Sequence, residues 1–388
     1  MELTDYNSNF VREQENYKYN NLSTAIKQKR KSCKLYDAEF LNANLLPPTY
    51  SVYLADARKK IIMDKIADII ITSPPYWKKR DYKLKKQIGQ EKSVEDYIEV
   101  ITNVMDNWKG LLKDSGSVFL NVGDSYLKGR RMQIPSRIAI EAEKCGWVLR
   151  DQIIWVKPNS TPHSANQRLP IREEFILHFT KNNKYFYDIH GFKKRFDTVT
   201  NVWTIKPAYH QGEHLAPFPD ELVERILLLS GPKYVCAECG KPFVRKLKKT
   251  VELDESRPQA ERAMAKLKES DLTVEHIKAV QAVGISDAGK AIKFQSGAGK
   301  NSSEVRRLAL EAKDILGGYF REFTFAKKKT VGWEGCTCGA KIQPGLIYDP
   351  FIGSGTSLRV ANKLRFSIIG SDIKFYNSLK QTLAKTEF

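Results

Sequence analysis

The stretch that decides the fold is GLIYDPFIGSGTSLRVANKLRFSIIGSDI, residues 345–373. It predicts a strand that ends at Asp349, a glycine-rich turn, a helix and a second strand that ends at Asp372. Gly353 and Gly355 let the backbone pass close to a ligand. Asp372 follows Gly353 by 19 residues, the distance at which nucleotide-binding βαβ units place an acid on ribose hydroxyls. Because no Gly-Lys-Ser/Thr follows the turn, the expected ligand is an adenosine that bears no phosphate.

Only 32 residues follow Thr356, too few to complete a sheet around this unit. Ser93 and Asp96 mark the start of one helix as a capping pair. Short apolar runs before turn signals predict the missing strands at 50–57, 67–77, 116–124 and 149–157, and helical spacing predicts helices over 93–112 and 135–147. Strands that alternate with helices imply a parallel α/β sheet with helices on both faces. We therefore expect the two ends of the chain to close one sheet, with a basic segment inserted between them.

A second motif, Ser73-Pro74-Pro75-Tyr76, follows the buried strand at its carboxyl end, where α/β sheets bind ligands. The two prolines stiffen the turn and remove two N–H groups, which leaves carbonyls as the available polar groups. Ser73 Oγ and a main-chain carbonyl can accept hydrogen bonds from an amino group, and Tyr76 offers a face for a planar ring. On these residues alone, a rigid turn whose aromatics pack on a neighbour is an equally good interpretation.

The two motifs together, Ser73-Pro74-Pro75-Tyr76 and Asp349-Pro350-Phe351-x-Gly353-x-Gly355-Thr356, resemble the β class of S-adenosyl-methionine-dependent DNA amino-methyltransferases. The likeness covers most of the chain from about residue 50. It implies a circularly permuted, Rossmann-like methyltransferase sheet and S-adenosyl-methionine as the cofactor. The cofactor-binding residues that it implies are Asp349, Phe351, Gly353, Gly355, Thr356, Asp372, Phe218 in HLAPFPDELVERIL, and Asp56 in LADA.

The resemblance implies methylation of an exocyclic amine in double-stranded DNA, with Ser73, Pro74, Pro75 and Tyr76 as catalytic residues. Acceptors at Ser73 and the Pro74 carbonyl would favour a nucleophilic nitrogen, and Tyr76 would stack on a base flipped out of the duplex. Family members with Ser at the first position are mostly cytosine-N4 enzymes, which favours cytosine N4. The alternatives are adenine-N6 methylation, RNA methylation, and a non-catalytic, zinc-containing nucleic-acid-binding module. A bacterial restriction-modification setting implies a cognate restriction endonuclease as a partner.

Four of the six cysteines fall in two tight pairs, Cys236-x-x-Cys239-Gly and Cys336-x-Cys338-Gly. Structural zinc takes four soft ligands, and a glycine after each pair allows the tight turn that points both sulfurs inward. The second pair is one residue shorter than the usual spacing, so two reduced pairs without metal and a redox dithiol are the alternatives. As zinc ligands, the four cysteines would staple the base of an inserted, mainly helical basic lobe.

The chain has 64 Lys and Arg against 45 Asp and Glu, a formal net charge of +19, which favours a polyanionic partner. The insert over 241–330 carries 20 Lys and Arg against 12 Asp and Glu. The run KKRDYKLKK directly after the catalytic turn is either a solvated loop or a set of phosphate contacts, and its place favours DNA contacts from Lys78, Lys79, Arg80, Lys83, Lys85 and Lys86. Four histidines lack metal-ligand spacing, and we expect them to be structural or to lie at the edge of the DNA-binding surface: His163, His178, His210 and His214.

We divide the chain into an N-terminal polar and basic arm (1–48), a catalytic part with target-recognition loops (49–235), a Cys-bounded insert (236–340) and a cofactor-binding part (341–388). The first 35 residues are expected to form a loose arm. Within the insert, 272–292 is interpreted as an ordinary helical hairpin in preference to a helix-turn-helix. No apolar run approaches the roughly 18 residues of a membrane span, and the start lacks a signal-peptide pattern. The expectation is a cytoplasmic protein without a membrane partner.

Overall fold

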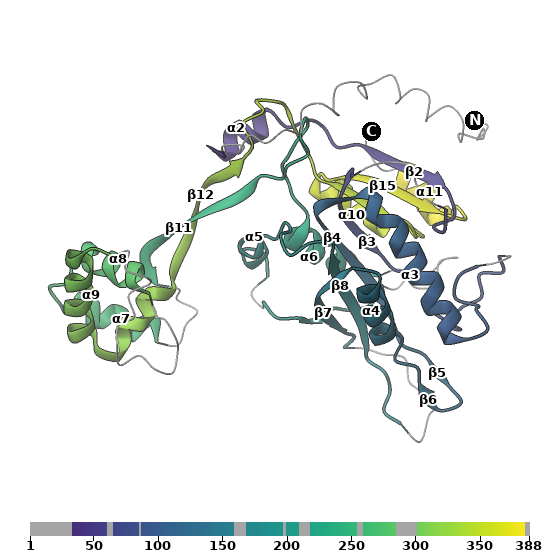
Figure 1. The fold of residues 1–388 in the computed structure, drawn as a ribbon, viewed down its shortest axis with the longest axis horizontal. Helices are drawn as coiled ribbons and strands as arrows, with labels where there is room; N and C mark the ends of the chain where they lie inside the picture. The colour runs from purple at the N-terminus through teal and green to yellow at the C-terminus, as the bar shows by residue number, and fades with distance from the viewer. Residues whose placement is uncertain are drawn as a thin grey trace.

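The computed structural model describes residues 33–59, 65–84, 87–158, 168–196, 199–208, 218–253, 259–284 and 301–384. Its centre is an eight-stranded sheet (Figure 1). In spatial order the strands are β2 (Tyr50–Leu54), β15 (Ser367–Asp372), β14 (Leu346–Asp349), β3 (Ala67–Thr72), β4 (Leu112–Val122), β8 (Glu173–Thr180), β7 (Val148–Val156) and β9 (Val202–Thr204). The C-terminal strands β14 and β15 lie between β2 and β3, so both ends of the chain do build one sheet.

The sheet is mixed, which corrects the expectation of a parallel sheet. The strands β2, β15, β14, β3 and β4 are parallel neighbours, but β8 runs antiparallel to both β4 and β7. The strands expected from the sequence did not include β8. Its apolar stretch, which ends in the buried residues Phe179 and Thr180, fits a central position and pairs with β4 on one side and β7 on the other.

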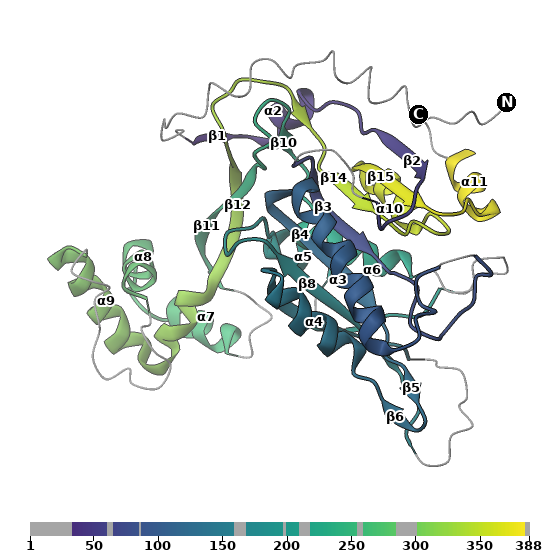
Figure 2. The same ribbon diagram turned by 45° about the vertical axis from the view of Figure 1, so that its right-hand side comes forward.

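Helices cover both faces of the sheet, as expected (Figure 2). One face packs on α3 (Val94–Leu111) and α4 (Ile134–Lys144). The other packs on α5 (Ile189–Lys193), α6 (Asp220–Ser230), α10 (Thr356–Leu364) and α11 (Asn377–Ala384). The capping pair at the start of α3 is confirmed, because Ser93 Oγ accepts from the Asp96 N–H at 3.0 Å and the Asp96 carboxylate accepts from the Ser93 N–H at 3.2 Å.

The insert consists of a long two-stranded ribbon that carries a helical lobe away from the main sheet (Figures 1 and 2). The ribbon is the antiparallel pair β11 (Val244–Leu253) and β12 (Ala326–Gly335). The lobe contains α7 (Ala260–Lys268), α8 (Val274–Val283), α9 (Ser303–Leu316) and the 3-10 helix η2 (Gly317–Phe325). The helices are predicted by the sequence but the ribbon is not, because lysines on both faces of the ribbon hide the alternation that marks a strand.

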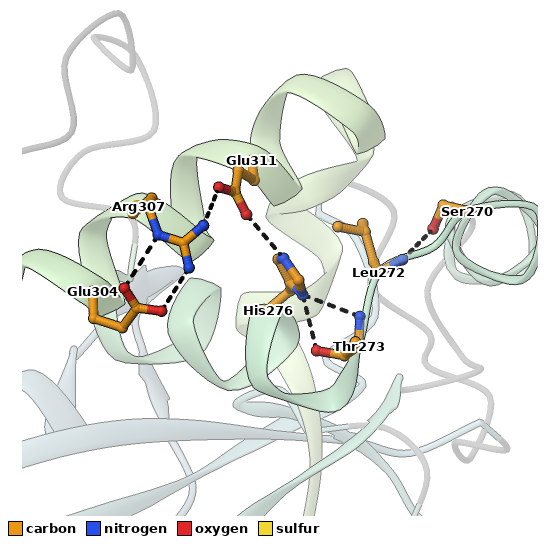
Figure 3. Close-up of polar contacts among 7 residues, drawn as sticks. All are labelled: Ser270, Leu272, Thr273, His276, Glu304, Arg307 and Glu311. Carbon is orange, nitrogen blue, oxygen red and sulfur yellow. Dashed lines mark hydrogen bonds and ion pairs between the residues drawn. The ribbon is translucent and has the colours of Figure 1, made fainter.

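The lobe has its own apolar core and a polar network that joins α8 to α9 (Figure 3). His276 Nδ1 accepts a hydrogen bond from the Thr273 N–H at 3.1 Å, and its Nε2 lies 3.1 Å from the Glu311 carboxylate. The Arg307 guanidinium forms ion pairs with the Glu311 carboxylate at 2.5 Å and with the Glu304 carboxylate at 2.6 Å. These contacts give His276 a structural role. The hairpin predicted over 272–292 is described as far as Gly284, where α8 ends, and its remainder lies outside the described residues.

Residues 1–32, most of the arm expected to be loose, lie outside the described residues, and the described end of the arm is packed. Strand β1 (Lys34–Tyr36) adds to the ribbon beside β12, and α2 (Ala38–Ala43) places Leu41 in a fully buried position among the residues of the cysteine region. Two short pairs complete the fold: β10 (Val235–Cys236) with β13 (Ile342–Gln343), and β5 (Tyr126–Leu127) with β6 (Arg130–Arg131). Among the described residues, no helix has the length and apolar character that crossing a membrane requires.

Candidate functional site

The site lies where β3 and β14 run side by side and their following helices diverge. The chain continues from β3 to α3 on one face of the sheet and from β14 to α10 on the other. In α/β sheets such a divergence opens a crevice at the carboxyl ends of the strands, and ligands bind there. The two sequence motifs meet at this point, because the Thr72 hydroxyl donates to Asp349 Oδ1 at 2.8 Å.

Asp349 organises the glycine-rich turn from a fully buried position. Its carboxylate accepts hydrogen bonds from the Phe351 N–H at 3.1 Å and from the Ser357 hydroxyl in the first turn of α10. Burial raises the pKa of Asp349 to about 6, although the Ser357 and Thr72 hydroxyls lower it. Gly355 adopts a φ of +86° immediately before α10 begins at Thr356, a conformation that favours glycine.

Asp372 lies at the end of β15 and faces the same turn. Its Oδ2 accepts a hydrogen bond from the Gly353 N–H at 3.0 Å, and burial raises its pKa. Strand β2 pairs Leu54 with Asp372, which brings Asp56 to the same edge two residues later. There Asp56 forms an ion pair with Arg58 at 2.6 Å, and this hydrogen bonding lowers the pKa of Asp56. The two predicted acids therefore share one end of the crevice.

Phe218 is positioned by α6, the helix that begins two residues after it. The side chain is 8% exposed and packs in the core on the α10 face of the sheet. The start of α6 is held to the start of α10 by an ion pair between Asp220 and Arg359 at 2.5 Å. The structure thus brings the cofactor residues predicted from distant parts of the sequence, among them Phe218, to the neighbourhood of the glycine-rich turn.

The Ser-Pro-Pro-Tyr turn is held in place by α3 and the segment before it. The Tyr97 hydroxyl donates to the Pro75 carbonyl at 3.0 Å, and Trp77 Nε1 donates to the Glu91 carbonyl at 3.1 Å. Pro74 is buried, whereas Ser73 is partly exposed. A turn fixed on both sides suits a site that must place an acceptor accurately.

A polar network that the sequence analysis missed surrounds the turn. The Tyr76 hydroxyl donates to Glu174 Oε2 at 2.7 Å, and Asn121 Nδ2 donates to Tyr76 Oη at 2.8 Å and to Glu174 Oε2 at 3.0 Å. Ser73 Oγ lies 3.3 Å from Tyr76 Oη, and Lys157 forms an ion pair with Glu174. Burial and the Glu174 charge raise the pKa of Tyr76. The phenol is thus fixed as a neutral donor.

Asn121 carries the feature of this network that points most directly to a ligand. It is 3% exposed, and its Oδ1 has no hydrogen-bond partner among the described residues. A buried acceptor left without a partner costs free energy unless a ligand supplies a donor. The signal in the sequence was a polar residue near the carboxyl end of a buried strand, in GSVFLNVGD, at the same sheet edge as the other motifs.

The basic run after the turn has a mixed character. Lys78, Lys79 and Lys83 are exposed, but Arg80 is partly buried and its carbonyl accepts hydrogen bonds from Gln87 at 3.2 Å and Gln90 at 2.7 Å. Burial raises the pKa of Tyr82 in the same run, and the Asp372 charge adds to the rise, which places this loop near the cofactor edge. Lys85 and Lys86 lie outside the described residues.

The four paired cysteines come together in space. Cys236, Cys239, Cys336 and Cys338 have sulfur atoms that all lie within 4.8 Å of one another. Four sulfurs at the Zn–S distance of about 2.3 Å would be about 3.8 Å apart in a tetrahedron, so small side-chain adjustments bring this cluster to that geometry. Pairing of β10 with β13 joins the two halves of the cluster, which lies at the foot of the ribbon.

The histidines take no part in the site where they are described. His178 is buried, stacks on Phe119 with ring centroids 4.3 Å apart, and lies 3.0 Å from Ser117 Oγ. Burial lowers the pKa of His178 to about 3, which keeps the ring neutral. His163, His210 and His214 lie outside the described residues.

Comparison with known proteins gives this site a context. A family profile described as DNA methylase matches residues 67–234. Type II methyltransferase M.SmaI of Serratia marcescens is 32% identical over 248 residues, which span 54% of this chain and 84% of that protein. Type II methyltransferase M.Cfr9I of Citrobacter freundii is 31% identical over 195 residues, 42% of this chain and 65% of that protein. The solved structure of the PvuII cytosine-N4-specific DNA methyltransferase has 16% identity and a TM-score of 0.48 over 85% of this chain and 84% of that one.

Proposed function

The chain belongs to the family of S-adenosyl-methionine-dependent DNA amino-methyltransferases that modify cytosine N4 or adenine N6, and on that premise we propose that it methylates cytosine N4 in double-stranded DNA. The observation that carries the proposal is the pair of acceptors beside the Ser-Pro-Pro-Tyr turn, Ser73 Oγ and the unpaired Asn121 Oδ1. An exocyclic amine has two hydrogens, and two acceptors match them.

The cofactor lies, in this proposal, in the crevice beside the glycine-rich turn. Asp372 binds the hydroxyl groups of the cofactor's ribose, and Asp56 lies near its adenine end. Phe218 packs against the adenine ring. The residues Asp349, Phe351, Gly353, Gly355 and Thr356 shape the turn that receives it. S-adenosyl-methionine supplies an electrophilic methyl group on a sulfonium sulfur.

The target base is flipped out of the duplex and stacks on Tyr76, whose ring the hydrogen bonds to Glu174 and Asn121 hold in one orientation. Ser73 Oγ accepts one amine hydrogen, and the other is shared between Asn121 Oδ1 and the Pro74 carbonyl. These contacts draw the nitrogen lone pair out of conjugation with the ring. The nitrogen then bonds to the methyl carbon as the carbon–sulfur bond breaks, and it loses a proton to water. Glu174 and Lys157 are positioning residues for this turn.

Cytosine is favoured over adenine by Ser73, because the family members that carry Ser at this position are mostly cytosine-N4 enzymes. Adenine N6 remains the second candidate, since the same acceptors suit any exocyclic amine. The exposed lysines at 78, 79 and 83, together with Arg80, Lys85 and Lys86, contact phosphates beside the flipped base in this proposal. A restriction endonuclease that cuts the same sequence is the partner that the type II relatives suggest.

We further propose that Cys236, Cys239, Cys336 and Cys338 bind one structural zinc ion. The proximity of four soft ligands supports the proposal, because structural zinc takes four such ligands at close range. The strand order of the main sheet is interpreted as circular permutation of the methyltransferase fold, with 49–235 and 341–388 as its two parts.

The pH dependence of cofactor binding follows from Asp349. Its folded pKa of about 6 lies above the value of a free aspartate, so acidification protonates it and disturbs its contact with Ser357 at the start of α10. We expect the Kd for S-adenosyl-methionine to rise below pH about 6, by at most about tenfold per pH unit. Calorimetry between pH 5 and pH 8 measures this. A Kd that is constant across that range would contradict the role given to Asp349.

Two experiments test the proposed function in outline. Binding of labelled S-adenosyl-methionine separates an enzyme from a non-catalytic nucleic-acid-binding module, which would bind DNA but no cofactor. Methylation-sensitive sequencing of a host that expresses the chain, in an otherwise unmethylated strain, then gives the recognition sequence. A host genome without new methylation, from a protein shown to bind the cofactor and DNA, would overturn the proposal.

A further inference from the structure

The ribbon carries lysines opposite one another on two successive rungs. Lys248 pairs with Lys329 and Lys249 pairs with Lys328 in the antiparallel register. Like charges in directly opposite positions destabilise a β-ladder. All four side chains are exposed, and none has an ion pair or hydrogen bond with another described residue. Elsewhere on the same ribbon the positive charges are matched, as for Lys246, which pairs with Glu334 at 3.0 Å.

The two lysine pairs lie on opposite faces of the ribbon, since side chains alternate along a strand. The ladder has a register shift between Lys246 and Leu247, but Arg245 and Leu247 line one pocket together with Asp188, so they share a face. Arg245 binds Asp188 there at 2.8 Å, at the start of α5, and Lys249 shares this face because it follows Leu247 by two residues in regular register. This inner face is therefore directed toward the catalytic body, by which we mean the eight-stranded sheet and the helices that cover it. Lys328 lies on the same face because it is opposite Lys249. The outer face carries Lys248 and Lys329. The two faces differ in their surroundings while their lysine pairs are alike.

The inner face meets further positive charge on the catalytic body. Burial lowers the pKa of His190 in α5, and the charges of Arg245, Lys194 and Lys328 lower it further. Lys194 is exposed at the end of α5. Asp188 is already engaged by Nε and Nη2 of Arg245, at 3.0 and 2.8 Å, so it does not neutralise the lysines. The lysines that this junction brings together, Lys194, Lys249 and Lys328, thus lack matching acids among the described residues.

The ribbon is held firmly enough to present this surface. Arg245 also stacks over the Trp333 ring, 4.3 Å from its centroid, and donates to Thr330 Oγ1 at 3.1 Å. At the far end, Gln281 of the lobe donates to the Thr250 carbonyl at 2.7 Å. A rigid cationic surface loses little conformational freedom when it binds a polyanion.

We propose that the inner surface formed by Lys249, Lys328 and Lys194 binds the phosphate backbone of the DNA substrate outside the catalytic crevice. The proposal rests on the proposed function only for the identity of the polyanion. We favour DNA over an acidic protein as the partner, because an acidic protein would offer carboxylates at irregular spacing. Lys249 and Lys328 on one rung, with Lys194 at the end of α5, suit the continuous row of phosphates of a duplex. The contact supplies affinity that does not depend on base sequence, and the lobe extends the footprint of the protein along the duplex.

The test compares matched charge reversals on the two faces. We expect K249E/K328E to weaken binding of a labelled duplex of about 30 base pairs at least tenfold at low salt, and to reduce the slope of log Kd against log salt by about two. K248E/K329E makes the same charge change on the neighbouring rung, on the outer face, and should weaken binding less than about threefold. K249R/K328R should bind like the wild type, and thermal unfolding checks that each variant is folded.

Equal losses from the inner and outer reversals, or no loss from either, would overturn the proposal. Methyl transfer measured on the same proteins separates this inference from the proposed function. At saturating DNA, K249E/K328E should keep the wild-type kcat while its KM for DNA rises. A wild type that transfers no methyl group, yet shows the expected binding difference between the two faces, would refute the proposed function and leave the phosphate contact standing.

Discussion

Replacement of Ser73 by alanine should lower kcat for methyl transfer by about 10²-fold, because removing a positioned hydrogen-bonding group at a reacting centre typically costs that much. The mechanism uses Ser73 Oγ as an acceptor for the amine, and Asn121 Oδ1 and the Pro74 carbonyl cannot replace its position. The Kd for S-adenosyl-methionine should stay within about twofold, since the cofactor residues belong to other elements. Single-turnover transfer and calorimetry measure the two quantities.

S93A is the matched control for this substitution. Ser93 caps α3 on the same side of the sheet, so its loss should lower the free energy of unfolding by about 1 kcal/mol without changing kcat. If S73A and S93A reduced transfer equally, the effect of S73A would be structural and the mechanism would lose its acceptor. Unchanged kcat in S73A would refute the role of Ser73 outright.

Replacing Cys336 and Cys338 by serine should remove zinc from the protein and unfold the foot of the ribbon. A structural zinc site contributes several kcal/mol, and a loss of about 4 kcal/mol corresponds to a fall of about 10 °C in Tm for a unit of this size. Leu41, Tyr234 and Trp333 pack around the cluster, so the change should reach β12 and α2. Elemental analysis, circular dichroism and Tm measure the outcome.

C145S is the control, because Cys145 is exposed at the end of α4 and far in sequence from the paired cysteines. It should keep both the metal and the Tm of the wild type. Purified wild-type protein without zinc, with a Tm that a strong chelator does not change, would show that the cluster is a set of reduced thiols.

The parallel part of the central sheet, from β2 to β4, was predictable because its strands carry unambiguous signals. Asp349, the two glycines and Asp372 place a strand, a turn and a second strand without any tertiary information. The cap at Ser93 is equally local, since both of its hydrogen bonds join residues three positions apart. The union of the chain ends followed from the small number of residues after Thr356. Local chemistry and chain length were sufficient in each of these cases.

The ribbon and the Glu174 network were not predictable for the opposite reason. Lysines on both faces of β11 and β12 remove the apolar alternation, and the strand pairing depends on partners about 80 residues apart in sequence. Glu174 approaches Tyr76 only because β8 enters the sheet beside β4, 98 residues after the turn. Neither contact leaves a pattern in a short window of sequence. The missed strand β8 and the missed positioning residue therefore have one cause.

The measurement that tests the central claim most directly is the identity of the methylated nucleoside. Purified protein, labelled S-adenosyl-methionine and duplex DNA containing the recognition sequence are incubated, and the digested nucleosides are separated by mass spectrometry. We expect label in N4-methylcytosine, reduced in S73A in proportion to its kcat. Label in N6-methyladenine alone would contradict the assignment of cytosine. No labelled nucleoside from folded protein that binds cofactor and DNA would contradict the enzymatic function itself.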